Sequence, residues 1–229
     1  MPLSRRALAE LRAAFGARLL LDEPLARHAS ARIGGPADAF LAARSLDDLR
    51  RPAGIAWACE VPFFVLGGGS NVLISDAGVR GLVVHNRTHG LSFAGTRVVA
   101  ESGVSAVSLA RRTISRGLAG LEWAAGLPGT VGGAVFGNAG AHGGDMAQSV
   151  VYVEAVTPGG DVRLTRADLA FEYRSSILKR EPRPLVMLSV ALDLAEGDRA
   201  ALEARAEAYR QYRRRTQPQG ATIGSMFKN

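Results

Sequence analysis

The sequence predicts an α+β fold composed of two small units. The chain has 229 residues, of which 47% are hydrophobic, so it can bury a sizeable core. Strand-like and helix-like segments are mixed without regular alternation, and the second half contains a clear hairpin signal. Both features favour α+β units over a doubly wound parallel sheet.

The first half contains two expected helices and several short strands. Apolar residues recur at helical spacing over residues 4–18, with a stop at Gly16. Ser45 begins the second helix, because a serine can cap the first turn, and Asp47 and Asp48 suit its positive end. The expected strands are residues 37–42, 61–66, 72–75, 81–85 and 97–101.

The second half begins with an expected helix over residues 105–116. A Pro-Gly-Gly triplet at residues 158–160 joins two strand-like runs and predicts a hairpin. The expected strands of this half are residues 150–157, 161–165, 171–175 and 185–194. A long helix follows over residues 198–215, and Pro218 and Gly220 end it.

Two glycine-rich segments carry the strongest functional signal. The first glycine loop is Gly67-Gly68-Gly69-Ser70-Asn71, and the second glycine segment comprises residues 125–141. Glycine at this density lets the backbone turn sharply and approach a ligand closely, and exposed amides suit a phosphate. Two such segments indicate a ligand that carries a diphosphate. The glycine patterns of the common dinucleotide-binding and P-loop folds are absent from the sequence.

Composition narrows the other functional classes. A single cysteine, Cys59, rules out an internal disulfide, and the four histidines lack the spacing of metal ligands, so we expect no metal centre. The net charge of +7 fits small phosphorylated ligands. It also leaves nucleic-acid binding open as an alternative, although only 6% of residues are aromatic and no nucleic-acid-binding motif occurs. No apolar run could cross a bilayer and no signal-like segment occurs, so we expect a cytoplasmic protein without membrane insertion.

Four blocks of the sequence resemble the UDP-N-acetylenolpyruvoylglucosamine reductase family. They are residues 66–74, 126–144, 173–176 and 224–229, and they occur in the family's order over nearly the whole chain. The first two blocks are typical of a wider class of FAD enzymes with the PCMH-type FAD-binding fold. The last two are much more specific to this reductase family.

The resemblance implies non-covalently bound FAD and a division into domains. Residues 1–85 and 86–205 would form two FAD-binding subdomains, and residues 206–229 would begin a substrate-binding domain that is incomplete in this chain. The residues expected to bind FAD are Gly67, Gly68, Gly69, Ser70, Asn71, Gly129, Thr130, Gly133, Asn138, Gly140 and Arg213. For Arg213 the alternative is a solvated cluster at a helix end.

The resemblance also implies the reaction. NADPH supplies a hydride that FAD passes to the enolpyruvyl double bond of UDP-N-acetylglucosamine enolpyruvate, so that negative charge develops on the substrate. Arg174 matches the family's catalytic arginine, whose planar guanidinium can stabilise a carboxylate. Ser225 matches the proton donor and Asn229 a substrate-contacting position. Tyr173 either lies beside the active site or fills the core.

One catalytic residue of the family has no counterpart in this sequence. The family's third catalytic residue is a glutamate near the C-terminus, and no glutamate follows Ser225 here, so we expect a fragment. The short interval between Arg174 and Ser225 favours the compact subtype of the family, and we expect a monomer. The alternatives are another PCMH-type FAD oxidase or dehydrogenase acting on a sugar or lactone, and a non-catalytic nucleic-acid-binding module.

Overall fold

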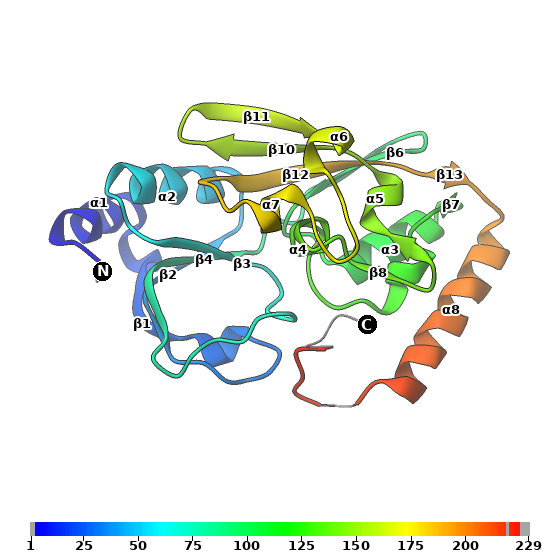
Figure 1. Ribbon diagram of the computed structural model, residues 1–229, viewed down its shortest axis with the longest axis horizontal. Coiled ribbons are helices and arrows are strands. Elements are labelled where there is room, and N and C mark those ends of the chain that lie inside the picture. Colours follow the sequence, from blue (N-terminus) through cyan, green and yellow to red (C-terminus); the bar gives the residue numbers. More distant parts are fainter. Residues whose placement is uncertain (1–2, 219, 225–229) are drawn as a thin grey trace.

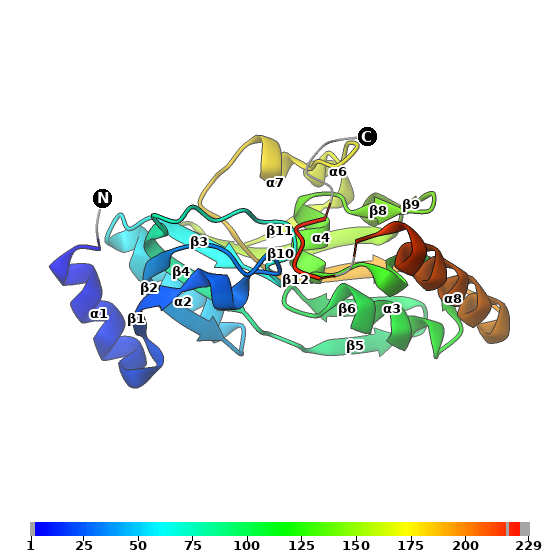
Figure 2. The same cartoon turned by 90° about the horizontal axis from the view of Figure 1, so that it is seen from below.

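Two β-sheets divide the chain into two halves that lie side by side (Figure 1). The computed structural model describes residues 3–218 and 220–224. The first sheet has the strand order β1-β2-β4-β3, and the second has the order β11-β10-β12-β6-β5. Mixed helices and sheets in each half confirm the α+β prediction. Helix α1 lies at one end of the molecule and α8 at the other, as Figures 1 and 2 both show.

The elements of the first half are α1 (Arg5–Phe15), η1 (Gly16–Arg18), β1 (Leu20–Pro24), η2 (Leu25–His28), β2 (Pro36–Ala43), α2 (Asp47–Ala58), β3 (Phe63–Leu66) and β4 (Val79–Asn86). The longer elements of the second half are β5 (Leu91–Ala94), β6 (Arg97–Glu101), α3 (Ala106–Ile114), α4 (Val131–Phe136), β10 (Val150–Thr157), β11 (Gly160–Thr165), β12 (Val186–Asp193) and α8 (Arg199–Thr216). Its short elements are β7 (Leu118–Ala119), η3 (Glu122–Gly126), β8 (Gly140–Ala141), β9 (Gly144–Asp145), α5 (Met146–Ser149), α6 (Arg166–Leu169), α7 (Ile177–Arg180) and β13 (Ala195–Glu196).

Helices α1 and α2 cover one face of the first sheet. The Ser4 hydroxyl accepts a hydrogen bond from the Ala7 amide and caps α1. Leu11 of α1, Leu49 of α2 and Leu82 of β4 are fully buried in one core. The amphipathic pattern of residues 4–18 therefore gives the predicted helix, and its apolar stripe buries that face of the sheet.

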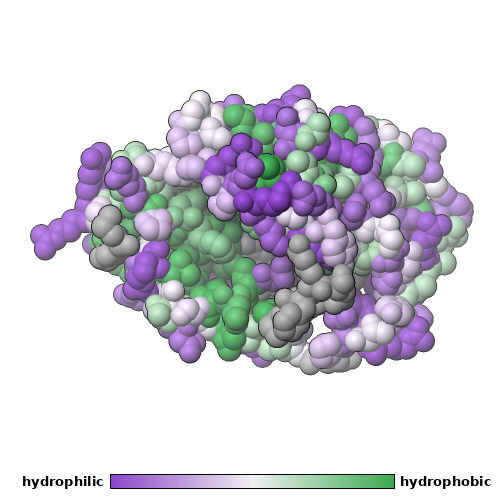
Figure 3. Space-filling model, viewed as in Figure 1, coloured by the Kyte–Doolittle hydropathy of each residue, from purple (hydrophilic) through white to green (hydrophobic). Residues whose placement is uncertain are grey.

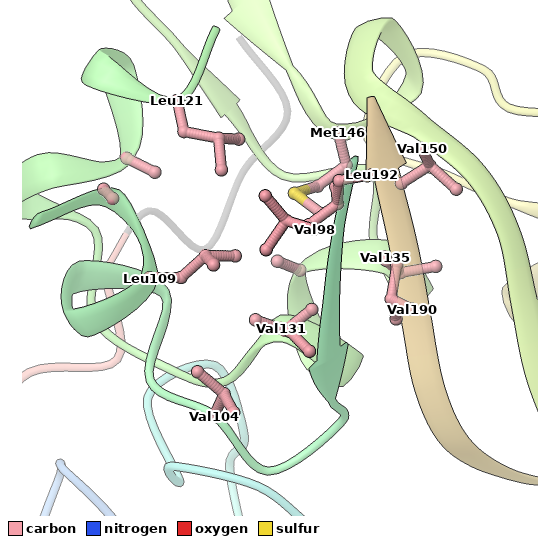
Figure 4. Packing of buried hydrophobic residues seen from close by; sticks show 14 of the residues in the cluster. Val98, Val104, Leu109, Leu121, Val131, Val135, Met146, Val150, Val190 and Leu192 are labelled. Carbon is pink, nitrogen blue, oxygen red and sulfur yellow. The ribbon is translucent and has the colours of Figure 1, made fainter. Parts of the chain in front are cut away.

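The second half packs its helices against the antiparallel sheet. Figure 4 shows Leu109 of α3, Val131 of α4 and Val98 of β6 in one core, and all three belong to the same buried cluster. The predicted hairpin is confirmed, because β10 and β11 pair in register up to Thr157 and Gly160 around the turn.

A shared core joins the two halves. Val186 and Leu188 belong to strand β12 of the second sheet, yet both pack fully buried in the core cluster of the first half. The hydrophobic core of the first half consequently includes side chains of the second sheet. Burial of these side chains fixes how the two sheets lie relative to each other.

A buried polar network lies at the junction between the halves. The Asn86 side-chain amide donates to Ser102 Oγ over 2.8 Å, and the Ser102 hydroxyl donates to the Met187 carbonyl over 2.7 Å. Asn86 Oδ1 accepts from both the amide and the hydroxyl of Thr88. Thr88 Oγ1 in turn accepts from the Gly103 amide over 3.1 Å. The segment between β4 and β5 is therefore anchored to β4 and to the residues that follow β6, and Ser102 links those residues to β12, by bonds shielded from water.

Two predicted strands are wrong. Residues 72–75 are extended loop, because the Ser75 carbonyl accepts from the Gly35 amide of another loop instead of joining a strand ladder. Residues 171–175 contain a tight turn, in which the amides of Glu172 and Ser175 each bond to the other residue's carbonyl. Arg174 in this turn has a φ of 57°, which a strand does not accommodate.

The glycine-rich stretch also contains a helix that we did not expect. Residues Val131–Phe136 form α4, capped by Thr130. The long predicted helix is confirmed as α8, in which Leu202 and Ala206 pack into the core of the second half. The expected boundary between residues 205 and 206 thus lies inside a continuous helix. None of the helices in the described ranges combines the length and apolar character that crossing a membrane requires.

We predict that Asn86→Ala lowers the free energy of unfolding by about 1–3 kcal/mol. The substitution removes the hydrogen bonds that Asn86 makes to Ser102 and Thr88, and it leaves those buried groups unpaired. Urea denaturation monitored by circular dichroism measures the loss. Ser92→Ala, an exposed position in β5, is the matched control and should change stability by less than about 0.5 kcal/mol. Equal stabilities for both variants would show that the network does not hold the junction.

Candidate functional site

The two glycine-rich segments touch each other at the junction of the halves. A Cβ atom added at Gly67 would lie 2.5 Å from Thr130 Oγ1, and one added at Gly68 would lie 3.0 Å from the Gly129 Cα. A Cβ at Gly129 would lie 2.8 Å from Ser70 Oγ. A Cβ at any of these positions would make a tight contact, so glycine lets the two backbones lie this close without a shift. Segments far apart in the sequence therefore form one surface.

The first glycine loop packs against residues 28–30, at the end of η2. Gly69 has a φ of 63°, and a Cβ there would lie 2.1 Å from the His28 carbonyl oxygen. The Ser30 amide donates to the Gly69 carbonyl over 2.9 Å. The loop consequently leaves β3 in a fixed direction, with a left-handed backbone that glycine adopts without strain.

The second glycine segment is pinned to the backbone that enters α3. The Ala106 amide donates to the Gly129 carbonyl over 3.1 Å, and the Val131 amide donates to the Val104 carbonyl over 2.8 Å. The Gly132 amide donates to the Ser102 carbonyl over 2.8 Å. Ser102 therefore links the second glycine segment to the buried network at the junction.

Backbone amides are available where the loops meet. Within the described ranges, the amides of Gly68, Gly69, Ser70 and Asn71 donate no hydrogen bond to a protein backbone. The start of α4 lies next to them, where Thr130 caps the helix by accepting from the Gly133 amide over 3.4 Å. Unused amides beside a helix start favour an anionic group, and a phosphate is the common one.

A hollow of about 340 Å³ adjoins this contact. Gly67, Gly68 and Thr130 contribute to its wall, and Arg87 and Arg112 also line it. Its lining thus combines glycine backbone with positive charge, which attracts anions. A larger hollow of about 530 Å³ lies at α6, but it is lined mainly by alanine side chains and has none of the glycine-loop backbone.

Arg174 and Tyr173 stand at the tip of the turn formed by residues 172–175. The Tyr173 side chain is 60% exposed, so the core-filling alternative is wrong, and the Arg174 guanidinium carbon lies 5.5 Å from the centre of its ring. The Lys179 ammonium donates to the Arg174 carbonyl over 3.2 Å. The turn therefore presents a cation and an aromatic ring together on the surface.

Asn138 attaches this turn to the end of α4. Its side-chain nitrogen donates to the Glu172 carbonyl over 2.9 Å, and its Oδ1 accepts from the Ala147 amide over 3.0 Å. Asn138 is only 4% exposed. The buried Ser176 hydroxyl adds a bond to the Phe136 carbonyl over 2.8 Å. Asn138 thus supports the turn, and its expected role in binding FAD stays a prediction.

The remaining expected residues fall into three groups. The methylene chain of Arg213 lies over Gly126, where an added Cβ would be 3.1 Å from its Cδ, whereas Arg214 and Arg215 are exposed. Gly140 is required inside a hairpin, because a Cβ there would lie 2.7 Å from the Gly144 carbonyl. Ser225 and Asn229 lie outside the described residues.

A salt bridge fixes the helix that carries Arg213. Glu122 in η3 is 4% exposed, accepts from the Gly120 amide over 2.6 Å and pairs with Arg205 of α8 over 3.2 Å. Arg213 consequently lies at the start of the second glycine segment and in the last turn of α8, and its FAD-binding role stays a prediction.

Sequence reasoning missed the residues that support the loops. The network of Asn86, Thr88 and Ser102 has no local motif, because it joins residues from separate segments. In the described parts of the chain, no group of three or more histidine, cysteine, aspartate or glutamate side chains is arranged to hold a metal ion.

Comparisons with known proteins agree with this geometry. A family model described as an FAD binding domain matches residues 37–166. UDP-N-acetylenolpyruvoylglucosamine reductase of Rubrobacter xylanophilus is 43% identical over 209 residues, which cover 90% of this chain and 70% of that protein. The reductase of Bacillus subtilis is 37% identical, with 98% of this chain and 75% of that protein covered.

Solved structures of known proteins resemble this chain as well. The crystal structure of UDP-N-acetylenolpyruvylglucosamine reductase from Thermus caldophilus superposes with a TM-score of 0.76 and 30% identity, covering 92% of this chain and 74% of that one. An alkyldihydroxyacetonephosphate synthase has a TM-score of 0.64 at 19% identity, covering 86% of this chain and 45% of that one, and shares the fold alone.

We predict that Asn138→Ala frees the 172–175 turn. The variant loses both side-chain hydrogen bonds of a buried amide, so the free energy of unfolding should fall by about 1–3 kcal/mol. Hydrogen exchange of the Ser175 amide, which bonds to the Glu172 carbonyl over 3.1 Å, should become faster. Unchanged exchange at Ser175 would contradict the supporting role.

Proposed function

The chain belongs to the UDP-N-acetylenolpyruvoylglucosamine reductase family, and we propose that it reduces the enolpyruvyl group of UDP-N-acetylglucosamine enolpyruvate in peptidoglycan synthesis. FAD is its cofactor. The observation that carries the proposal is the contact between the two glycine-rich segments, which gathers unused amides at one place. Identity of 43% to a reductase of this name supports the choice of substrate.

FAD fits the junction on structural grounds. Its diphosphate needs several donors at close range, and the amides around Gly68 and Ser70 supply them where any Cβ would obstruct the approach. We assign the diphosphate to residues 67–71 and 129–133, with Gly140 and Arg213 nearby. FAD, when bound, supplies the hydride-transfer chemistry of the reaction. NADPH as the hydride donor is part of this proposal.

The first half also carries exposed apolar side chains. On the face shown in Figure 3, apolar residues gather over the first half, whereas the second half is more hydrophilic. Ile33, Phe64 and Leu73 of the first half are between 42% and 68% exposed. Exposed apolar groups of this kind are typical of ligand-binding faces, and the ring systems of a dinucleotide would cover them.

Arg174 is the proposed catalytic cation. Reduction of the enolpyruvyl group places negative charge on the substrate carboxylate and the carbon beside it, and a fixed guanidinium stabilises that charge most in the transition state. The positive φ of Arg174 and the Asn138 anchor fix the backbone from which the guanidinium extends. Ser225 is the proposed proton donor, and Tyr173 and Asn229 are the proposed substrate contacts.

The proposal extends to organisation and location. Residues 1–85 and 86–205 serve as the two FAD-binding subdomains, and the protein acts as a monomer in the cytoplasm on a small UDP-sugar. The alternative, oxidation of a sugar or lactone by another enzyme of this fold, has only the fold in its favour. Alkyldihydroxyacetonephosphate synthase shares that fold, and a shared fold does not determine the reaction.

Anaerobic absorption spectroscopy tests the function. The FAD-loaded full-length protein is reduced with NADPH and then mixed with UDP-N-acetylglucosamine enolpyruvate while the flavin band is followed. Stoichiometric return of the oxidised band, with formation of UDP-N-acetylmuramate, is the expected result. A flavin that is reduced but stays reduced would reject this substrate, and a protein that never acquires a flavin band would reject the cofactor site.

Replacing Arg174 separates catalysis from cofactor binding. We expect Arg174→Lys to slow substrate-dependent reoxidation by about 100- to 1000-fold, since a lysine cannot reproduce the planar two-point contact. The rate of reduction by NADPH should remain near that of the wild type, and Arg183→Ala, at an exposed position nearby, should leave both rates unchanged. Stopped-flow absorbance measures the two rates, and equal loss in both would argue against the assigned role.

Replacing a loop glycine by alanine tests the proposed diphosphate site, residues 67–71 and 129–133. In Gly68→Ala the new Cβ meets the Gly129 Cα at 3.0 Å, so the two backbones must separate. We expect FAD affinity to fall about tenfold, which corresponds to about 1.4 kcal/mol. Gly54→Ala is the control, because no atom lies within 4 Å of its added Cβ in the middle of α2. Titration by flavin fluorescence should show wild-type affinity for Gly54→Ala. Wild-type affinity for Gly68→Ala would contradict the assignment of the diphosphate to the two glycine-rich segments.

A further inference from the structure

The turn that carries Arg174 is held on both of its sides. Two residues before Arg174, the Glu172 carbonyl accepts from the Asn138 side-chain amide over 2.9 Å. Two residues after it, the Ser176 hydroxyl donates to the Phe136 carbonyl over 2.8 Å. Phe136 is the last residue of α4, and Asn138 follows it closely. The end of one short helix therefore anchors the turn at two points.

The Ser176 hydroxyl completes the C-terminal end of α4. The last four carbonyls of an α-helix have no partners within the helix. In α4, three of these carbonyls accept from the backbone amides of residues 137–139, at distances between 2.8 and 3.2 Å. The fourth belongs to Phe136 and accepts from Ser176, which lies 40 residues further along the chain. A contact between distant segments thus satisfies the end of this helix.

Ser176 makes this contact in place of a local one. It occupies the N-cap position of α7, where a serine hydroxyl ordinarily accepts from an amide of the first turn. Among the described residues, no amide of α7 donates to the Ser176 hydroxyl. The residue is fully buried, so its bond to the Phe136 carbonyl is shielded from water. The hydroxyl therefore serves the contact with α4 and not the capping of its own helix.

The backbone between the two anchors has an unfavourable conformation. Arg174 has a φ of 57°, in the left-handed region that disfavours any residue with a Cβ. Such a conformation persists only where the surrounding bonds over-determine it. Inside the turn, the amides of Glu172 and Ser175 each bond to the other residue's carbonyl. Loss of an outer anchor consequently allows the turn to relax and the start of the Arg174 side chain to move.

We propose that Ser176 is a positioning residue for Arg174. By donating to the Phe136 carbonyl, its hydroxyl holds Arg174 in the left-handed conformation from which the guanidinium reaches the substrate carboxylate. This inference rests on the proposed function, because Arg174 is its catalytic cation. Ser176 touches neither substrate nor cofactor in this assignment, and its effect on the rate passes through the backbone of the turn.

Ser176→Ala tests the proposal, since it removes the donor without adding volume. In the full-length protein we expect substrate-dependent reoxidation of the flavin to slow about tenfold, because a displaced guanidinium stabilises the transition state less well. Reduction by NADPH should keep the wild-type rate, and stopped-flow absorbance measures both rates. Thr113→Val is the matched control, because the buried Thr113 hydroxyl also donates to a helix carbonyl, that of Ala110, over 2.9 Å. It should leave both rates unchanged.

An Arg174→Ala background shows whether Ser176 acts through Arg174. In this background we expect Ser176→Ala to change the reoxidation rate less than about twofold, since no guanidinium remains to be displaced. A further tenfold loss there would overturn the positioning role. A wild-type reoxidation rate in Ser176→Ala alone would overturn it as well, and so would equal slowing of both half-reactions, which would indicate a general loss of structure.

Hydrogen exchange separates this inference from the proposed function, because it needs no substrate. Exchange of the Ser175 amide should become faster in Ser176→Ala and remain unchanged in Thr113→Val. Unchanged exchange in Ser176→Ala would show that the hydroxyl does not hold the turn, and would overturn the inference. A wild-type flavin that the substrate fails to reoxidise would instead overturn the proposed function.

Discussion

The close approach of two backbones at the junction is the constraint on which the rest of the structure depends. A Cβ at Gly68 would lie only 3.0 Å from the Gly129 Cα, and the two glycines belong to different halves of the molecule. Because the contact tolerates little displacement, the two sheets must be held in a fixed position relative to each other. The buried Val186 and Leu188 side chains and the Asn86 to Ser102 hydrogen bond provide that rigidity.

Helix α4 connects the junction to the turn that carries Arg174, the proposed catalytic cation. It begins at Thr130, beside the amides, and ends next to Asn138, which anchors residues 172–175. A helix of this length spans about 9 Å, so the turn with Arg174 lies at a set separation from the contact between the glycine-rich segments. A short helix in the glycine-rich stretch thus sets the relative position of the proposed diphosphate site and the proposed catalytic cation.

Local sequence signals predicted most of the regular elements and both glycine-rich segments. The strand at residues 97–101 and the hairpin around Pro158 follow from side-chain alternation and turn chemistry. Residues 72–75 look like a strand by composition, but no neighbouring strand is available, and pairing is decided by distant residues. Helix α4 was missed because its two internal glycines disfavour a helix, while a Thr130 cap and tertiary packing override that propensity.

The candidate site divides in the same way. Glycine density and the family resemblance pointed to the loops and to Arg174, but no local pattern could show that Asn138 supports a turn, since that role depends on a contact between distant segments.

A crystal structure of the protein with FAD tests the central claim most directly. The account predicts the diphosphate within hydrogen-bond distance of amides from both residues 67–71 and residues 129–133, with the two backbones still in contact. A diphosphate bound by one segment alone, or by neither, would contradict it.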